Sequence, residues 1–233
     1  MNEYTVRSKE VGGYTVNVII DDDPGVVSPR DWDNLGTIKS FSRHLLDEYT
    51  GPKYASVPAA DVPAEVLVQC DQWDDDVPMA ELDLTQPRHF IAWLQITGAE
   101  FLTLYAYVHG GIALSAGTDV LICPWDSGQV GYYFTNQEVI DKFGTPPDRV
   151  RACLLGEVDE FAAYLRGEVY GYQVEDEDGE IIDSCWGFIG DSDYCLTEGV
   201  AAAEYQIKED NRRADEINQR LTIAIAKGEL PTA

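Results

Sequence analysis

The stretch EVYGYQVEDEDGEIIDSCWGF, residues 168–188, decides the fold class because it predicts two strands and the turn that joins them. Residues 168–175 and 180–188 are the expected strands. Asp176-Glu-Asp-Gly179 forms a tight hairpin turn between them, with glycine at the position that needs a positive φ. A strand pair of this kind predicts an antiparallel sheet in this part of the chain.

A long helix is expected directly after this hairpin, from about Tyr194 to Lys227. Its apolar positions step by three and four residues, with Asn211 in the one polar slot, and Gly228 and Pro231 provide the stop. At 1.5 Å per residue the helix spans roughly 45–50 Å, which is more than a small sheet needs. Its distal end is therefore expected either to cross its own domain or to pair with a second copy in a homodimer. The apolar positions are Leu196, Val200, Ala203, Ile207, Ala214, Ile217, Leu221 and Ile225.

Outward from this region, β-prone runs and helix signals alternate along the chain. Strands are expected at 14–20, 101–108, 112–115 and 130–134, and helices at 88–97, 136–143 and 148–165. The pattern predicts an α+β fold with a mainly antiparallel sheet, flanking helices and a long C-terminal helix. We expect one core domain over residues 1–193, followed by the helix at 194–227. The core includes a long irregular acidic region at about 50–87 that has short elements inside it, such as one at 65–69.

Two windows contain most of the surplus charge. Residues 45–87 have a net charge of −9 and residues 157–198 of −12, which is 21 of the 26 net negative charges. Such a surplus costs compactness through self-repulsion, and small domains usually sit at a magnitude of roughly 2–8. The windows predict a surface that faces a cationic partner, on which direct contact with nucleic acid would be repelled. General solubility is the alternative interpretation.

Composition bounds the environment of the protein. The sequence predicts no signal peptide and no membrane span, and its five scattered cysteines suit a reducing cytoplasm. Acidic runs such as Asp74, Asp75 and Asp76 place successive carboxylates on opposite sides of the backbone. The hairpin turn does not fit a calcium loop, because Val174 and Cys185 would occupy its first and last ligand positions. No metal and no cofactor is therefore expected.

One group of residues offers a catalytic alternative. His109 lies at a strand end before two glycines, and the segment 123–131 brings Cys123 and Asp126 close together in sequence. These could form a Cys/His nucleophile pair, in a pocket completed by Trp32, Asp33, Asn34 and Trp125. The simpler interpretation is a turn with a buried thiol, a packing tryptophan and Asp126 capping local amides.

Four motifs together resemble a family of proteins, without a settled activity, that tailed phages and prophages encode. They are SPRDWDNLGT at 28–37, CPWDSGQVG at 123–131, RGEVYG at 166–171 and DSCWGFIGD at 183–191, and the resemblance spans roughly residues 14–205. It implies a phage accessory protein that acts in the host cytoplasm. This chain lacks the basic residues that such relatives often carry after the first motif, so its acidity is a feature of this member.

The leading functional hypothesis is a phage-derived acidic binding protein that inhibits a host nucleic-acid-handling or defence system by imitating nucleic-acid charge. Its partner would be a basic host protein. The acidic surface would comprise Asp74, Asp75, Asp76, Glu175, Asp176, Glu177 and Asp178. The first alternative is an enzyme or small-ligand binder with the pocket described above. The second is an interaction module that dimerises through the C-terminal helix.

Overall fold

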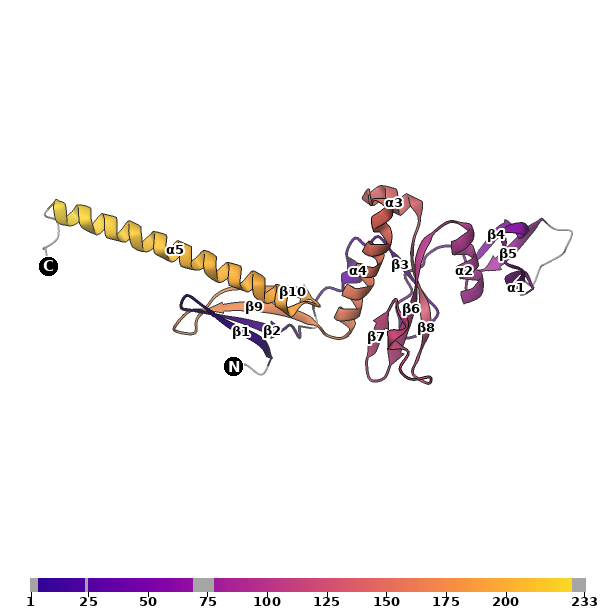
Figure 1. Ribbon diagram of the computed structural model, residues 1–233, viewed down its shortest axis with the longest axis horizontal. Helices are drawn as coiled ribbons and strands as arrows, with labels where there is room; N and C mark the ends of the chain where they lie inside the picture. The colour runs from indigo at the N-terminus through magenta and orange to yellow at the C-terminus, as the bar shows by residue number, and fades with distance from the viewer. Residues whose placement is uncertain (1–3, 24, 69–77, 228–233) are drawn as a thin grey trace. The chain divides into compact units, whose positions relative to one another are not determined.

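The computed structural model describes residues 4–23, 25–68 and 78–227. The chain folds as two compact units (Figure 1). Unit 1 combines residues 1–27 with 167–233, and unit 2 comprises residues 28–166. This division differs from the single core expected over 1–193, because the N-terminal strands pair with the hairpin at 169–189 and the C-terminal helix packs on that same sheet.

Unit 1 contains a four-stranded antiparallel sheet in the order β1-β2-β9-β10. Its strands are β1 (Thr5–Val11), β2 (Tyr14–Ile20), β9 (Val169–Glu175) and β10 (Ile181–Ile189). Gly12 and Gly13 form a two-residue turn between β1 and β2 with φ of +56° and +96°. Only glycine adopts two such angles in succession at little cost, which explains the type I′ geometry of this turn.

Helix α5 (Ser192–Ala226) begins on this sheet and continues past it (Figure 1). The Asp191 carboxylate caps the helix by accepting from the amides of Asp193 and Tyr194. A Cβ on Gly199 would lie 2.6 Å from Cγ1 of Val16, so only glycine permits this close packing. The core of the unit consists of Val16, Val18, Tyr172, Val174, Cys195 and Ala203.

Unit 2 is built on a second antiparallel sheet in the order β3-β8-β6-β7. Its strands are β3 (Thr37–Ser40), β6 (Glu100–Val108), β7 (Ile112–Ser115) and β8 (Ser127–Thr135). Along β8 the buried side chains alternate between faces. Tyr133 belongs to one hydrophobic core, and Tyr132 and Phe134 belong to the other. Both faces of this sheet are therefore covered.

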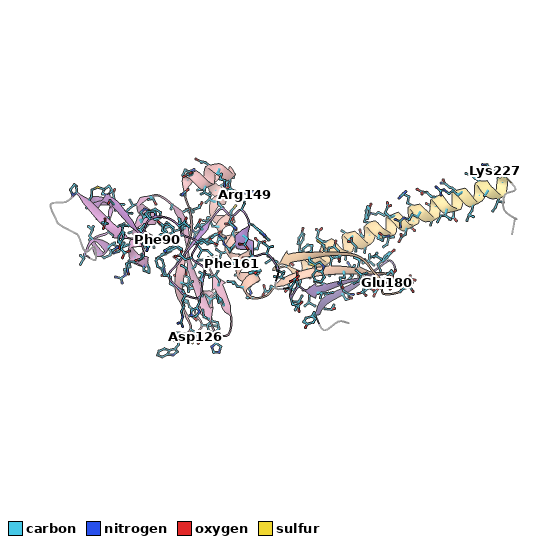
Figure 2. All side chains as sticks on the ribbon, turned by 180° about the vertical axis from the view of Figure 1, so that it is seen from behind. Phe90, Asp126, Arg149, Phe161, Glu180 and Lys227 are labelled. Atoms are coloured by element: carbon cyan, nitrogen blue, oxygen red, sulfur yellow. The ribbon has the colours of Figure 1, made fainter. Side chains whose placement is uncertain are left out.

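Helix α4 (Pro147–Leu165), preceded by α3 (Gln137–Phe143), packs on the first face. Asn136 caps α3 and Gly144 ends it at φ +64°, as the sequence predicted. Helix α2 (Pro87–Ile96) packs on the second face, with Phe90 completely buried among aromatic rings. Figure 2 labels Phe90 on α2 and Phe161 on α4, one from each core.

The second face of the sheet is extended by a small two-stranded sheet of β4 (Tyr54–Pro58) and β5 (Met79–Asp83), with the short helix α1 (Ala64–Leu67) between them. The short element expected near 65–69 corresponds to α1, whereas the pairing of β4 with β5 within the region 50–87 was not expected. Val57, Ala80 and Leu82 are buried in the core with Phe90. Strands of five residues flanked by prolines give too short a pattern to recognise.

Three short 3₁₀ turns complete the described structure, at Pro29–Asp31, Ala59–Asp61 and Thr118–Val120. The α+β class, the antiparallel pairing and the long C-terminal helix are confirmed. Across residues 4–23, 25–68 and 78–227, no helix is long and apolar enough to cross a membrane.

Candidate functional site

The SPRDWDNLGT motif builds a buried ion pair. The Ser28 hydroxyl accepts a hydrogen bond from the Arg30 amide and caps the 3₁₀ turn that carries Arg30. The Arg30 side chain reaches Tyr133 on β8. The Arg30 guanidinium donates two hydrogen bonds to the Glu48 carboxylate, both at 2.8 Å, and a third to the Tyr133 hydroxyl at 2.6 Å. Only 5% of the Arg30 side chain is exposed. A bidentate pair at this depth holds distant segments of unit 2 together.

The same cluster extends to Glu157 on α4. The Tyr133 hydroxyl donates to the Glu157 carboxylate at 2.5 Å, and that carboxylate also accepts from the amides of Leu35 and Gly36. Burial raises the pKa of Tyr133 strongly, and the nearby Glu157 raises it further, so the hydroxyl stays protonated as a donor. We call Arg30, Glu48, Tyr133 and Glu157 the Arg30 network. It satisfies its own charges and leaves the motif a structural role.

Trp32, Asp33 and Asn34 therefore do not form a pocket with the CPWDSG turn. The Asn34 amide donates to the carbonyls of Pro29 and Trp32, which fixes the loop, and Trp32 is partly exposed. The loop is anchored at Tyr133, whereas the turn precedes Ser127 at the other end of β8. Six residues of strand separate these two positions by about 20 Å. The expected three-part pocket is thus wrong.

The three residues of the proposed catalytic group, His109, Cys123 and Asp126, do lie close together. The carboxylate of Asp126 lies 3.6 Å from Nδ1 of His109 and 3.6 Å from Sγ of Cys123. Figure 2 labels Asp126 at the end of the unit 2 sheet. The His109 side chain is 73% exposed. Trp125, which precedes Asp126 in the sequence, is 91% exposed, so it is not the packing anchor of the alternative interpretation. The cluster is an open surface rather than an enclosed site.

The β9–β10 turn holds the clearest acidic surface among the described residues. Glu177, Asp178 and Glu180 are exposed, and Glu175 is half-buried. The Asp176 carboxylate accepts from the amides of Asp178 and Glu180, at 3.0 and 2.9 Å, and so shapes the turn. We call residues 175–180 the acidic hairpin.

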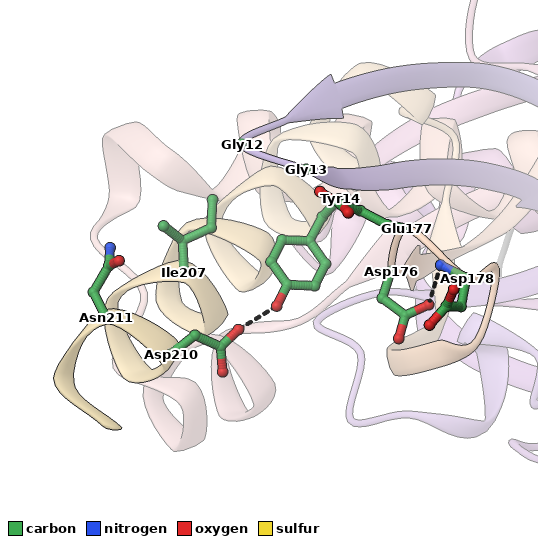
Figure 3. Close-up of a pocket in the computed structure, with 9 residues that line it drawn as sticks. All are labelled: Gly12, Gly13, Tyr14, Asp176, Glu177, Asp178, Ile207, Asp210 and Asn211. Carbon is green, nitrogen blue, oxygen red and sulfur yellow. Dashed lines mark hydrogen bonds between the residues drawn. The ribbon is translucent and has the colours of Figure 1, made fainter. Parts of the chain in front are cut away.

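A pocket of about 280 Å³ lies between this hairpin, the β1–β2 turn and α5 (Figure 3). The Tyr14 hydroxyl donates to the Asp210 carboxylate on its wall, and this bond raises the pKa of Tyr14. Ile207 contributes an apolar surface beneath the carboxylates. No local pattern predicts the Tyr14–Asp210 contact, because the two residues are 196 positions apart.

Some acidic residues of the first window, 45–87, lie outside the described residues, and others have other roles. Asp74, Asp75 and Asp76 lie outside the described residues. In the first acidic window Asp47 pairs with Lys39 at 2.7 Å, and Glu48 belongs to the Arg30 network. These two carboxylates serve the fold of unit 2, whereas other acids of that unit, such as Glu138, Asp141 and Asp148, are exposed.

Among the described residues, no group of three or more His, Cys, Asp or Glu side chains is arranged to hold a metal ion. Comparisons with known proteins add no assignment, since no protein-family model, curated protein or solved structure gives a significant match.

Proposed function

We propose that this protein is a non-enzymatic binding protein whose acidic surface captures a basic partner by imitating the charge of nucleic acid. The observation that carries the proposal is the acidic hairpin, whose outward carboxylates have solvent or backbone amides around them rather than cationic side chains. The resemblance to phage proteins suggests the class of partner, a host protein that handles nucleic acid or acts in defence.

The crowding of the carboxylates supports imitation of a phosphate backbone. Residues 175–178 are four successive acids that run from the last residue of β9 into the turn, so like charges gather within a short segment. Duplex DNA likewise gathers negative charge, one per about 1.7 Å of its axis. A protein that recognises dense negative charge therefore meets such a charge at the acidic hairpin.

A second candidate is an enzyme or ligand binder centred on His109, Cys123 and Asp126. The convergence of a thiol and an imidazole on one carboxylate favours it. Its geometry is poor for a nucleophile pair, however, because activation needs the imidazole beside the thiol, and here the carboxylate lies beside both. We therefore rank binding above catalysis.

A third candidate is an interaction module built on α5. Ile217, Leu221 and Ile225 continue the sheet-facing stripe of the helix and are 57%, 45% and 41% exposed. A contiguous apolar stripe of this kind marks an interaction surface. It is compatible with the first proposal, because the stripe and the acidic hairpin occupy different parts of unit 1.

Competition with DNA tests the first proposal. Labelled duplex DNA is bound to a purified basic, sequence-independent DNA-binding protein, and its displacement by our protein is followed by fluorescence anisotropy. The hairpin variant carries Glu177→Gln, Asp178→Asn and Glu180→Gln, and it keeps Asp176 because that side chain shapes the turn. We expect it to displace DNA on the order of tenfold less well, since exposed charge pairs contribute about 0.2–1 kcal/mol each.

The control variant carries Glu138→Gln, Asp141→Asn and Asp148→Asn, three exposed acids of unit 2. It changes the net charge by the same amount and should compete like the unmodified protein. Equal losses in both variants would mean that total charge, and not the hairpin, is recognised. No displacement by the unmodified protein would contradict mimicry.

A further inference from the structure

The free part of α5 begins where the sheet of unit 1 ends. Ile207 contacts the β1–β2 turn at Gly12, and Asp210 accepts from Tyr14, but the stripe formed by Ala214, Ile217 and Leu221 continues beyond these contacts. This distal segment, residues 211–227, is about 25 Å long. An isolated helix of such length is marginal in water unless its apolar face packs against something.

Ion pairs on the distal segment mark its solvent face. Arg212 pairs with Glu209 and Glu216 at 2.7 Å each, three and four residues away. At 100° per residue Arg212 lies opposite the stripe centred on Leu221. The ion pairs thus lie opposite the stripe of Ala214, Ile217 and Leu221, as on a helix with one buried and one solvated face, although Ile223 is also on the solvent side.

The distribution of charge selects the partner. Residues 1–27 and 167–204, which build the sheet and the start of α5, contain sixteen acids and two bases. Residues 217–227 contain two bases, Arg220 and Lys227, and no acid. The end of α5 is therefore attracted by the acidic body of another copy of this chain, and it is the part of unit 1 where like-charge repulsion between two copies is weakest.

We infer that two copies of this protein pair through the distal segments of α5 in antiparallel orientation. The inference rests on the third candidate above, that the stripe is an interaction surface. Antiparallel pairing about Gln219 packs Ile217 of one copy against Leu221 of the other. It also sets Lys227 level with Asn211 of the second copy, beside the acidic pocket. Parallel pairing would instead place two sheet bodies of net charge −14 side by side.

The distal segments are short, so we expect their contact to bury less area than the roughly 1,200–2,000 Å² that stable interfaces bury in general. The dimer should therefore be reversible. Sedimentation velocity over a hundredfold concentration range should show the mass rising from monomer to dimer. Ile217→Asp should leave a monomer at every concentration. Ile223→Asp is the matched control, because Ile223 is 54% exposed but lies on the opposite side of the helix, and it should still dimerise.

Orientation is read by photo-crosslinking with p-benzoylphenylalanine in place of Ile225, followed by trypsin digestion of the covalent dimer. Antiparallel pairing sets position 225 level with residue 213 and joins it to the peptides on either side of that residue, 209–213 or 214–220, and parallel pairing joins it to 221–227. Recovery of the 221–227 crosslink, or a protein that stays monomeric, overturns the inference. DNA competition by the monomeric Ile217→Asp variant is measured separately, so failure of dimerisation is distinguished from failure of charge mimicry. If the unmodified protein is monomeric and Ile217→Asp abolishes its binding to a different protein, the dimer is wrong. The third candidate, an interaction module built on α5, is then retained.

Discussion

The Arg30 network and the acidic hairpin use negative charge in opposite ways. In the network, the Glu48 and Glu157 carboxylates are directed inward onto a guanidinium, a hydroxyl and backbone amides. In the hairpin, Glu177, Asp178 and Glu180 are directed to solvent. The difference teaches that an acidic stretch of sequence becomes an acidic surface only where no cation of the fold neutralises it. For this reason we give the Arg30 network of unit 2 a structural role and propose the acidic hairpin of unit 1 as a binding surface.

The largest expected effect comes from removing the cation of the network. Arg30→Met leaves the half-buried carboxylates of Glu48 and Glu157 without the positive charge of the network, which should cost about 3–5 kcal/mol of folding free energy. Urea unfolding followed by tryptophan fluorescence measures it. Arg149→Met, at an exposed position of α4, is the matched control and should change the unfolding midpoint little.

A double variant sharpens this prediction. Arg30→Met combined with Glu48→Met removes both partners of the bidentate pair, so it should recover part of the loss seen in Arg30→Met. If Arg30→Met is as stable as the Arg149→Met control, the network does not hold unit 2 together, and SPRDWDNLGT regains a claim to a binding role.

Alkaline pH should weaken unit 2 through Tyr133. Because burial raises its folded pKa above the ordinary value of about 10, the unfolded chain ionises first. The stability contributed by this hydroxyl is complete below pH 10 and is lost as pH rises above it, at up to 1.4 kcal/mol per pH unit. Urea midpoints between pH 9 and 11.5 should fall, and by a smaller amount in Tyr133→Phe. Equal slopes for the two proteins would show that Tyr133 is not the group responsible.

The hairpin should be nearly silent in the same stability assay. Neutralising Glu177, Asp178 and Glu180 removes exposed charges that have like-charged neighbours, so the free energy of unfolding should shift by less than about 0.5 kcal/mol. A loss comparable to that of Arg30→Met would mean that these carboxylates support the fold of unit 1 and are not held free for a partner.

Local patterns predicted the secondary structure well. The strand at 14–20, the hairpin, the capped helix at 137–143 and the long C-terminal helix all follow from turn residues, caps and apolar spacing that lie close together in sequence. The partners of Arg30 could not be predicted in the same way, because Glu48 and Tyr133 lie 18 and 103 residues away. One signal was available: a tyrosine within an apolar strand needs a partner for its hydroxyl.

The expected sites were predicted only in part for the same reason. His109, Cys123 and Asp126 converge because two neighbouring strands, β6 and β8, bring their loops together. Trp32 was joined to them on residue type alone, and the register of β8 separates it from them. The division into two units could not be predicted locally either, because it depends on the pairing of β2 with β9. These two strands are separated in the sequence by the whole of unit 2.

The most direct test of the central claim is the salt dependence of binding to a lysine-rich DNA-binding protein, measured for the unmodified protein, the hairpin variant and the control variant. Removing paired charges should flatten the slope of log affinity against log salt in the hairpin variant and leave it unchanged in the control variant. Identical slopes for all three proteins would contradict the claim that the acidic hairpin is the surface that recognises a basic partner.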